Sequence, residues 1–284
     1  MFSKVVKVIA AAMLLIAADM VFEINFPVVR EIKIHTEKLK KGKEILLLQI
    51  SDVHGSASGE IARKILKEAL KIRPAAVLVT GDLVDEATKD FNNVYKLIKG
   101  LHSICPEIFF VSGNHEWNND GRRELLTGLQ GLGVKLLNNK STVVTVDGIA
   151  VNICGVDDPY RRKDNIEKAM KGADGKRYSV LLAHSPRIRD RLGSYAPDLI
   201  LCGHTHGGQV RLPFVGAVIA PGEGLFPEFN KGKYNLHNGS LLYIDSGVGT
   251  SKLPIRFLNR SQISLIRIEG TGNTDFLRKN TENH

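Results

Sequence analysis

Histidine and acidic residues gather in short loops that follow apolar, strand-like runs. The stretch LILCGHTHGGQ, residues 199–209, ends an apolar run at a glycine and then presents His204 and His206 one residue apart. In an extended segment, side chains two positions apart point the same way, so we expect both imidazoles to face one ligand. The glycines at 203, 207 and 208 leave room for a sharp turn beside it. An isolated His-x-His pair is equally typical of ordinary loop composition, so the rest of the chain must decide.

Four other strand-like runs end in the same kind of loop. They finish in SDVHG, GDLVD, GNHEW and AHSP, which supply Asp52, His54, Asp82, Asp85, Asn114, His115, Glu116 and His184. Taken singly, Asp52 is explained as a helix cap, Asn114 as an Asx turn and His184 as a core histidine. Five such coincidences at successive strand ends favour a common metal-binding role instead.

The elements that must position these loops alternate in the first half of the chain. We expect strands over residues 44–51, 75–81 and 107–113, and helices where apolar residues recur at helical spacing over 61–70, 91–101 and 122–132. In the second half we expect a hairpin turning at Asp147-Gly148, and strands over 178–184, 198–204, 240–247 and 262–270. The pattern predicts one α/β domain over residues 44–270, with two stacked mixed β-sheets flanked by helices (an αββα sandwich). Residues 23–43 are interpreted as a connecting segment and 271–284 as a polar tail.

The composition is that of an ordinary globular protein with a positive net charge. The 284 residues carry a formal charge of +9, spread in short clusters with no long basic tract. This charge suits an anionic substrate or an anionic lipid surface and does not by itself imply nucleic acid. The sequence has one tryptophan and no aromatic residues interleaved with basic ones, which argues against nucleic acid as a partner. Cys105, Cys154 and Cys202 each lie in apolar surroundings and are interpreted as core residues that form no disulfide.

The amino terminus has the form of a membrane signal-anchor over residues 1–22. Lys4 and Lys7 precede an apolar run from Ile9 to Ala18, which reaches Phe22 when Asp19 is included. The residues near Ala18 fit a cleavage site poorly, so we favour an uncleaved anchor in the cytoplasmic membrane with the catalytic domain outside the cytoplasm. A cleaved signal and a buried amphipathic helix remain alternatives, because the run is at the short end of the ~17–25 residues that span a bilayer.

The order D-x-H, GD-x-x-D, GNH, H and GH-x-H resembles the calcineurin-like metallophosphoesterases over about residues 45–268. With the amino-terminal segment, the GHTHGGQ ending is similar to a bacterial membrane-associated branch that includes a UDP-diacylglucosamine pyrophosphatase and a cell-wall phosphoesterase. The resemblance implies two divalent cations bridged by Asp82. It implies that the first is also held by Asp52, His54 and His206, and the second by Asn114, His184 and His204.

The same resemblance implies that His115 faces the substrate and donates a proton or stabilises charge, and that Asp85 orients His115. Asp85 is alternatively an ordinary surface carboxylate. Glu116 stands where relatives often carry aspartate. Mixed nitrogen and oxygen ligands suit manganese, with iron and zinc also open. Two such cations ~3.5–4 Å apart neutralise a phosphate and lower the pKa of a shared water.

Candidate substrate contacts lie next to these loops. Arginine forks suit phosphate oxygens, which makes candidates of Arg161 and Arg187 and of their basic neighbours Arg162, Lys163, Arg189 and Arg191. Solvated helix faces explain such clusters equally well. The glycine-bearing, mostly apolar residues 212–234 are interpreted as a flap over the site, a surface that touches lipid, or a loop packed on the second sheet.

These observations predict a metal-dependent phosphohydrolase that cleaves a phosphate ester or a pyrophosphate bond. Its expected substrate is a phosphorylated small molecule, a nucleotide sugar or a lipid-linked molecule such as UDP-diacylglucosamine. The alternatives are a phosphodiesterase or nuclease on the same scaffold, and a scaffold protein of the same fold that has lost turnover.

Overall fold

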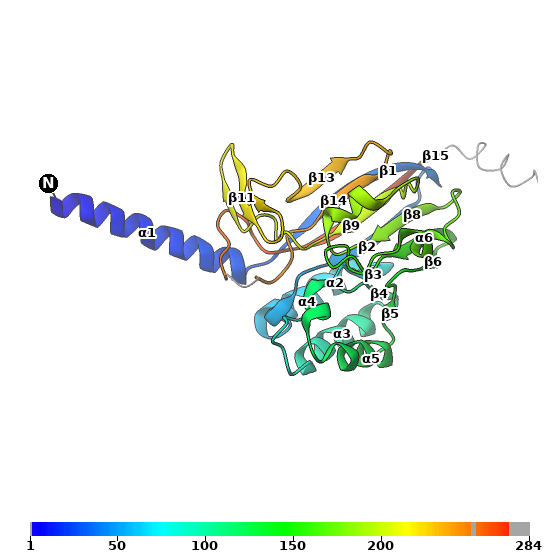
Figure 1. Ribbon diagram of the computed structural model, residues 1–284, viewed down its shortest axis with the longest axis horizontal. Helices are drawn as coiled ribbons and strands as arrows, with labels where there is room; N and C mark the ends of the chain where they lie inside the picture. The colour runs from blue at the N-terminus through cyan, green and yellow to red at the C-terminus, as the bar shows by residue number, and fades with distance from the viewer. Residues whose placement is uncertain (1, 251–253, 273–284) are drawn as a thin grey trace, which may run out of the picture.

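Two six-stranded sheets stack face to face and carry helices on their outer sides (Figure 1). The computed structural model describes residues 2–250 and 254–272. The first sheet consists, in spatial order, of β1 (Val28–Lys40), β15 (Gln262–Gly272), β2 (Glu44–Ile50), β3 (Ala76–Val79), β4 (Ile108–Phe110) and β5 (Lys135–Leu136). The second consists of β13 (Gly232–Asn235), β14 (Leu241–Ile244), β9 (Leu199–Cys202), β8 (Tyr178–Leu182), β7 (Ile149–Gly155) and β6 (Lys140–Val146). Both sheets mix parallel and antiparallel pairs, so the αββα prediction is confirmed.

Alternation along the central strands divides the core into three apolar layers. Leu47 of β2 packs between the two sheets, and its neighbour Leu48 packs on the opposite face against the helices. On β8, Val180 points into the layer between the sheets and Leu181 points to the outer layer. Because successive side chains of a strand point to opposite faces, a strand buried on both faces must be apolar at nearly every position.

Helices cover the outer faces of both sheets. The first sheet is covered by α2 (Gly59–Ile72), α3 (Asn92–Ile104) and α5 (Arg122–Gly131), which bury Ile65, Leu97 and Leu125. The second is covered by α6 (Ile166–Met170) and the 3-10 helix η2 (Pro186–Arg191). Two short elements lie in loops after strands of the first sheet: the 3-10 helix η1 (His54–Ser56) and α4 (Asn114–Asn118). The three longer helices on the first sheet confirm the helical spacing seen in the sequence.

The structure differs from prediction over residues 23–43, which are not a connecting segment. Most of this stretch is β1, which pairs in parallel with β15 from Val28 opposite Gln262 to Thr36 opposite Gly270. Ile32 and Ile34 alternate with Lys33 and His35, which is the period of a strand with one face towards the core. Charged residues on the outer face suit an edge strand, because they discourage pairing with other chains. The described part of the predicted tail continues β15 to Gly272, and the rest lies outside the described residues.

The hairpin expected at Asp147-Gly148 joins β6 to β7, and both turn residues have the positive φ that a two-residue hairpin loop requires. The three cysteines are buried and free, as predicted. Within residues 212–234 the structure places most of a small antiparallel sheet of β10 (Val210–Leu212), β11 (Gly216–Ala220) and β12 (Gly224–Leu225). This segment is therefore a folded insert beside the second sheet.

Helix α1 (Phe2–Asn25) projects from the body as one continuous rod (Figure 1). The 22 residues from Lys4 to Asn25 form a helix long and apolar enough to cross a membrane, and no residue of its most apolar stretch is buried within the molecule. The interpretation as a buried amphipathic helix is therefore not supported. The α1 helix ends three residues later than the predicted boundary at 22.

Candidate metal centre

Loops from both sheets meet at one end of the sandwich. Asp52 follows β2, Asp82 follows β3 and Asn114 follows β4, all of which are parallel strands of the first sheet. His184 follows β8 and His204 follows β9 in the second sheet. Because the carboxyl ends of parallel strands share an edge, the five loops converge. Six of the seven predicted ligands are buried, and Asn114 is half-buried.

The first cluster consists of Asp52, His54 and His206. One potential ligand atom from each lies within 4.8 Å of the others. The Nε2 atoms of His54 and His206 are 3.2 Å apart, and His206 Nε2 is 3.6 Å from an oxygen of Asp52. Two ring nitrogens that face each other beside a carboxylate oxygen leave room for a cation in contact with all three.

The second cluster consists of Asp82, His184 and His204, again with ligand atoms within 4.8 Å of one another. His184 Nε2 lies 3.0 Å from Asp82 Oδ2 and 3.2 Å from His204 Nδ1. On its other side, His184 Nδ1 lies 2.8 Å from the carbonyl oxygen of Thr80, to which it can only donate. This hydrogen bond fixes the tautomer of the neutral ring, in which Nε2 carries a lone pair directed into the cluster.

The backbone at the predicted ligands is unusual. Five of the seven have positive φ, namely Asp52 (49°), His54 (48°), Asp82 (52°), His204 (71°) and His206 (50°). This left-handed conformation costs free energy in residues other than glycine, and it persists where the surrounding structure enforces it. It also corrects the expectation for His204 and His206, which lie in a turn and not in an extended segment. Both imidazoles reach the centre, but into different clusters.

Two glycines allow the loops to pack closely. A Cβ at Gly113 would overlap the Asp82 carboxylate and lie 2.8 Å from the ring of His184. A Cβ at Gly203 would overlap Ser51 Oγ and the Asp52 carboxylate. Larger residues at either position would therefore displace a carboxylate of the centre.

The charges of the centre are arranged for cation binding. Burial opposes the charge on Asp82, but the imidazoles of His184, His54 and His115 together outweigh burial and hold the pKa of Asp82 well below its usual range. Burial lowers the pKa of His204 and of His206 to about 3, which keeps both rings neutral and their lone pairs free. The Oδ1 atom of Asn114 is buried and has no hydrogen-bond partner among the described residues. A mixed set of carboxylate, imidazole and unpaired amide oxygen fits a pair of divalent cations.

Glu116 has a role that sequence reasoning missed. Its carboxylate is fully buried and accepts hydrogen bonds from the backbone N–H groups of Asp82 (2.9 Å), Leu83 (2.7 Å) and Gly113 (2.7 Å). Burial, reinforced by the negative charge of Asp82, raises the pKa of Glu116 to about 7. Glu116 thus joins the loops that carry Asp82 and Asn114. Sequence alone signals only the bond from Gly113, which lies three residues before Glu116 as in a capping box; Asp82 and Leu83 come from a separate segment.

His115 lies at the edge of the centre, with its Nε2 atom 4.0 Å from Asp82 Oδ2. Its Nδ1 atom accepts a hydrogen bond from the backbone N–H of Glu86 at 3.3 Å, so in the neutral ring the proton is on Nε2. Asp85 Oδ1 lies 3.7 Å from His115 Nδ1 but 2.8 Å from His54 Nδ1. Asp85 therefore contacts His54 more closely than His115, which differs from the expectation.

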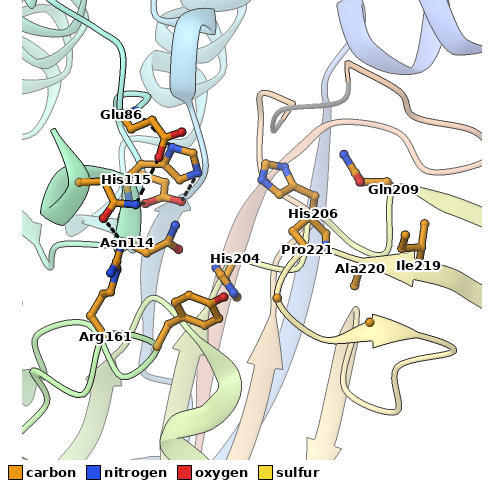
Figure 2. Close-up of a pocket in the computed structure, with 15 residues that line it drawn as sticks. Glu86, Asn114, His115, Arg161, His204, His206, Gln209, Ile219, Ala220 and Pro221 are labelled. Atoms are coloured by element: carbon orange, nitrogen blue, oxygen red, sulfur yellow. Dashed lines mark hydrogen bonds and ion pairs between the residues drawn. The ribbon is translucent and has the colours of Figure 1, made fainter.

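A cavity of about 510 Å³ opens over the centre. Figure 2 shows His115, Asn114 and Glu86 on one side of it, Ile219 and Ala220 on the other, and His204 and His206 between them. Tyr160, which sequence reasoning missed, also lines the cavity, and its ring centroid lies 4.9 Å from that of His204.

The two arginines proposed from sequence are placed differently. Arg161 lines the cavity and donates a hydrogen bond to Asn118. Arg187 is not among the lining residues; its Nε donates to Glu223 at 3.1 Å, and its guanidinium lies 4.7 Å from the centre of the Tyr160 ring. Arg187 therefore contacts Tyr160 of the cavity wall without lining the cavity itself.

A two-sheet sandwich with paired Asp/His clusters at its strand ends is the arrangement of metal-dependent phosphoesterases. Residues 45–208 match the family model described as calcineurin-like phosphoesterase, and the chain belongs to this family. Uncharacterized metallophosphoesterases of Helicobacter pylori and Aquifex aeolicus are each 34% identical to it, over 85% and 88% of this chain. The match spans 64% of the Helicobacter protein and 95% of the Aquifex protein.

Two further comparisons concern a relative with a transmembrane name and a solved structure. A zebrafish relative named transmembrane protein with metallophosphoesterase domain is 28% identical over 84% of this chain and 57% of its own length. The crystal structure of a 5'-nucleotidase precursor from Thermus thermophilus matches with a TM-score of 0.50 and 19% identity, over 84% of this chain and 57% of that one. This likeness supports the fold alone. The family makes the protein a metal-dependent phosphoesterase.

Proposed function

We propose that the two clusters hold two divalent cations bridged by Asp82. In this assignment Asp52, His54 and His206 complete the first site, and Asn114, His184 and His204 complete the second. The observation that carries the proposal is the convergence of two sets of ligand atoms, each within 4.8 Å, beside the unpaired Oδ1 of Asn114. We propose manganese as the occupant, because imidazole and carboxylate ligands suit it; iron and zinc fit the same donors.

The reaction we propose is hydrolysis of a phosphate ester or pyrophosphate bond. When bound, the cations supply charge neutralisation of the phosphoryl group and a water of lowered pKa. His115 directs its Nε2–H into the cavity, where it donates a hydrogen bond to the phosphoryl or leaving oxygen. The N–H of Glu86 holds this tautomer. His184 is held by Thr80 and His54 by Asp85, so both rings keep their orientation through the reaction.

The substrate we propose carries its phosphate on an amphiphilic molecule, for which a nucleotide-sugar lipid such as UDP-diacylglucosamine is one example. Supporting this, the cavity is polar on the side of His115 and Asn114 and apolar on the side of Ile219, Ala220 and Pro221. Arg161 at the cavity rim is positioned to contact a phosphate or a sugar hydroxyl. The ring of Tyr160 offers a flat surface to a sugar or a base.

We also propose that α1 anchors the protein in the cytoplasmic membrane with the catalytic domain outside the cytoplasm. The support is the apolar span from Lys4 to Asn25 and the position of Lys4 and Lys7 at its start, because positively charged flanks favour the cytoplasmic side.

The test of this function compares Asp82→Asn with Asp120→Asn in the full chain. Asp82 is buried in the second cluster, whereas the side chain of Asp120 is 90% exposed, so Asp120→Asn controls for loss of a carboxylate. We expect Asp82→Asn to lose bound manganese and turnover while keeping the parent circular dichroism spectrum, and Asp120→Asn to keep all three. Full turnover in Asp82→Asn would contradict the mechanism.

A substrate panel in added manganese then identifies the leaving group. It includes a phosphomonoester, a phosphodiester, a cyclic nucleotide, a nucleotide sugar and single-stranded DNA. Preference for DNA would favour the nuclease alternative. Failure of the parent protein to bind metal or to hydrolyse any phosphate ester would favour a scaffold without turnover.

A further inference from the structure

Exposed apolar side chains are concentrated in two places. In the described residues, all but three of the large apolar side chains that face solvent belong to α1, Phe26, Leu258 or the small sheet with its turns, residues 210–226; the exceptions are Leu70, Val143 and Tyr160. Within the small sheet the exposed residues are Leu212, Phe214, Val215, Ile219, Leu225 and Phe226. Phe214 is fully exposed, and Leu225 and Phe226 are more than 60% exposed. A concentration of this kind marks a surface that is covered in the working protein.

The small sheet is joined to the root of α1 through residues 257–261. On one side of this segment, Phe257 makes two backbone hydrogen bonds at 3.0 Å: it donates to Gln209, just before β10, and accepts from Arg211 of β10. On its other side, Leu258 N–H donates to the carboxylate of Asp19 (3.4 Å) and Ser261 N–H to the carbonyl of Glu23 (2.9 Å). Figure 1 shows the sheet, in yellow, at the end of the body from which α1 leaves. One short segment, residues 257–261, is therefore hydrogen-bonded both to the small sheet and to α1.

We propose that the β10–β12 sheet is a second membrane contact, which seats Phe214, Leu225 and Phe226 in the surface of the bilayer that α1 crosses. The occupant is lipid because the neighbouring apolar element is a helix of membrane-spanning length, and no residue of its most apolar stretch is buried in the body. Amphipathic contacts of this kind bury apolar side chains at the boundary between headgroups and acyl chains. Arg260, whose guanidinium lies 4.6 Å from the ring of Phe22, is placed at headgroup depth, where a cation contacts lipid phosphate.

This contact has a consequence for the substrate, and that consequence rests on the proposed function. Ile219, Ala220 and Pro221, on and after β11, form the apolar wall of the cavity, while the outer residues of the same sheet meet the bilayer. A lipid-borne phosphate can then enter the metal centre with its acyl chains still in the membrane.

The membrane contact is tested with the full chain in phosphatidylcholine–phosphatidylglycerol vesicles that contain brominated acyl chains. Three variants each add one tryptophan to the parent, whose single Trp117 gives the baseline: Phe214→Trp in the sheet, Leu14→Trp in α1, and Val143→Trp, an exposed apolar position on β6. Bromine quenches only an indole that enters the acyl region. We expect the added fluorescence to be quenched at least twofold at 214 and at 14, and to be unchanged at 143.

Three results would overturn the proposal. Quenching at 14 without quenching at 214 would show that α1 enters the bilayer while the sheet stays in water. A blue-shifted but unquenched signal at 214 shows that protein, such as a second copy, covers the sheet. Absence of quenching at 14 would show that α1 itself does not enter the bilayer. None of these readouts depends on catalysis, so they separate this proposal from the function.

A kinetic experiment tests the consequence for the substrate. The double variant Phe214→Asp with Phe226→Asp is expected to lose at least fivefold in turnover of a phosphate ester carried by vesicle lipid, with turnover of soluble p-nitrophenyl phosphate unchanged. Equal loss on both substrates would mean that the variant damages the cavity wall, and the idea of membrane delivery would then fail.

Discussion

Removal of the Glu116 carboxylate is the perturbation whose magnitude follows most directly from the structure. In Glu116→Ala, three backbone N–H groups that now donate at 2.7–2.9 Å lose their acceptor in a fully buried position. Each buried donor left unpaired costs about 1–3 kcal/mol, so the three together cost about 3–9 kcal/mol. Proteins are typically stable by about 5–15 kcal/mol, which makes this loss severe.

The expected fall in melting temperature is at least about 6 °C, since 1 kcal/mol corresponds to about 2–4 °C in a domain of this size. Glu116→Gln keeps one acceptor oxygen and turns its NH2 group towards the remaining donors, so it should cost about 1–3 kcal/mol. Because Glu116 ties the loops of Asp82 and Asn114 together, both variants should also bind manganese more weakly.

The assay is thermal unfolding of the full chain in detergent with a chelator, followed by circular dichroism, so that metal loss does not contribute. Glu124→Ala, which removes an exposed glutamate from α5, is the matched control and should melt with the parent. A melting temperature of Glu116→Ala within about 2 °C of the parent would refute the reasoning, because it would show that the three donors find other acceptors or water.

Three further perturbations test other parts of the structure. His115→Asn should lower kcat by about 10²-fold or more with bound manganese unchanged, measured by steady-state kinetics and metal analysis; lost metal would instead make His115 structural. Gly203→Ala should cost about 1–3 kcal/mol and weaken metal binding by displacing Asp52, whereas Gly175→Ala, where a Cβ meets no atom within 4 Å, should be neutral in unfolding and metal titrations. Burial raises the pKa of Asp245 to about 6, so its ionisation opposes folding: the contribution of Asp245 to stability is largest below the ordinary carboxyl pKa and is lost as pH rises through 6. In Asp245→Asn this fall should be smaller by about 3 kcal/mol in denaturant titrations across that range, and an unchanged pH profile would contradict the assignment.

The parts of the fold that are predictable from sequence are those where burial dictates composition. The runs around Leu47, Leu78 and Leu201 are buried on both faces, so they must be apolar throughout, and they were recognised as strands. The β1 strand was missed because it is an edge strand. Its charged residues, such as Lys33 and Lys38, give it the composition of a solvated linker. The β10–β12 sheet was missed because its glycines and prolines resemble a loop.

The convergence of the predicted ligands was predictable because each follows a recognisable strand, and strand ends of one sheet share an edge. The conformation of the loops was not. Positive φ at Asp82 and His206 is imposed by packing with other loops, and no local sequence pattern predicts this conformation. The same holds for Asp85, whose closer contact with His54 depends on the loop after β3 meeting the one after β2.

The position of β15 between β1 and β2 bears on how the protein is made. During synthesis β1 and β2 emerge more than two hundred residues before β15. The place of β15 between them therefore stays unfilled, and β1 stays unpaired with the sheet, until translation has nearly finished. Such non-local pairing slows folding and exposes unpaired strand edges to neighbouring chains. We expect nascent chains that stop before Gln262 to depend on chaperones and to be degraded, however complete their metal ligands are.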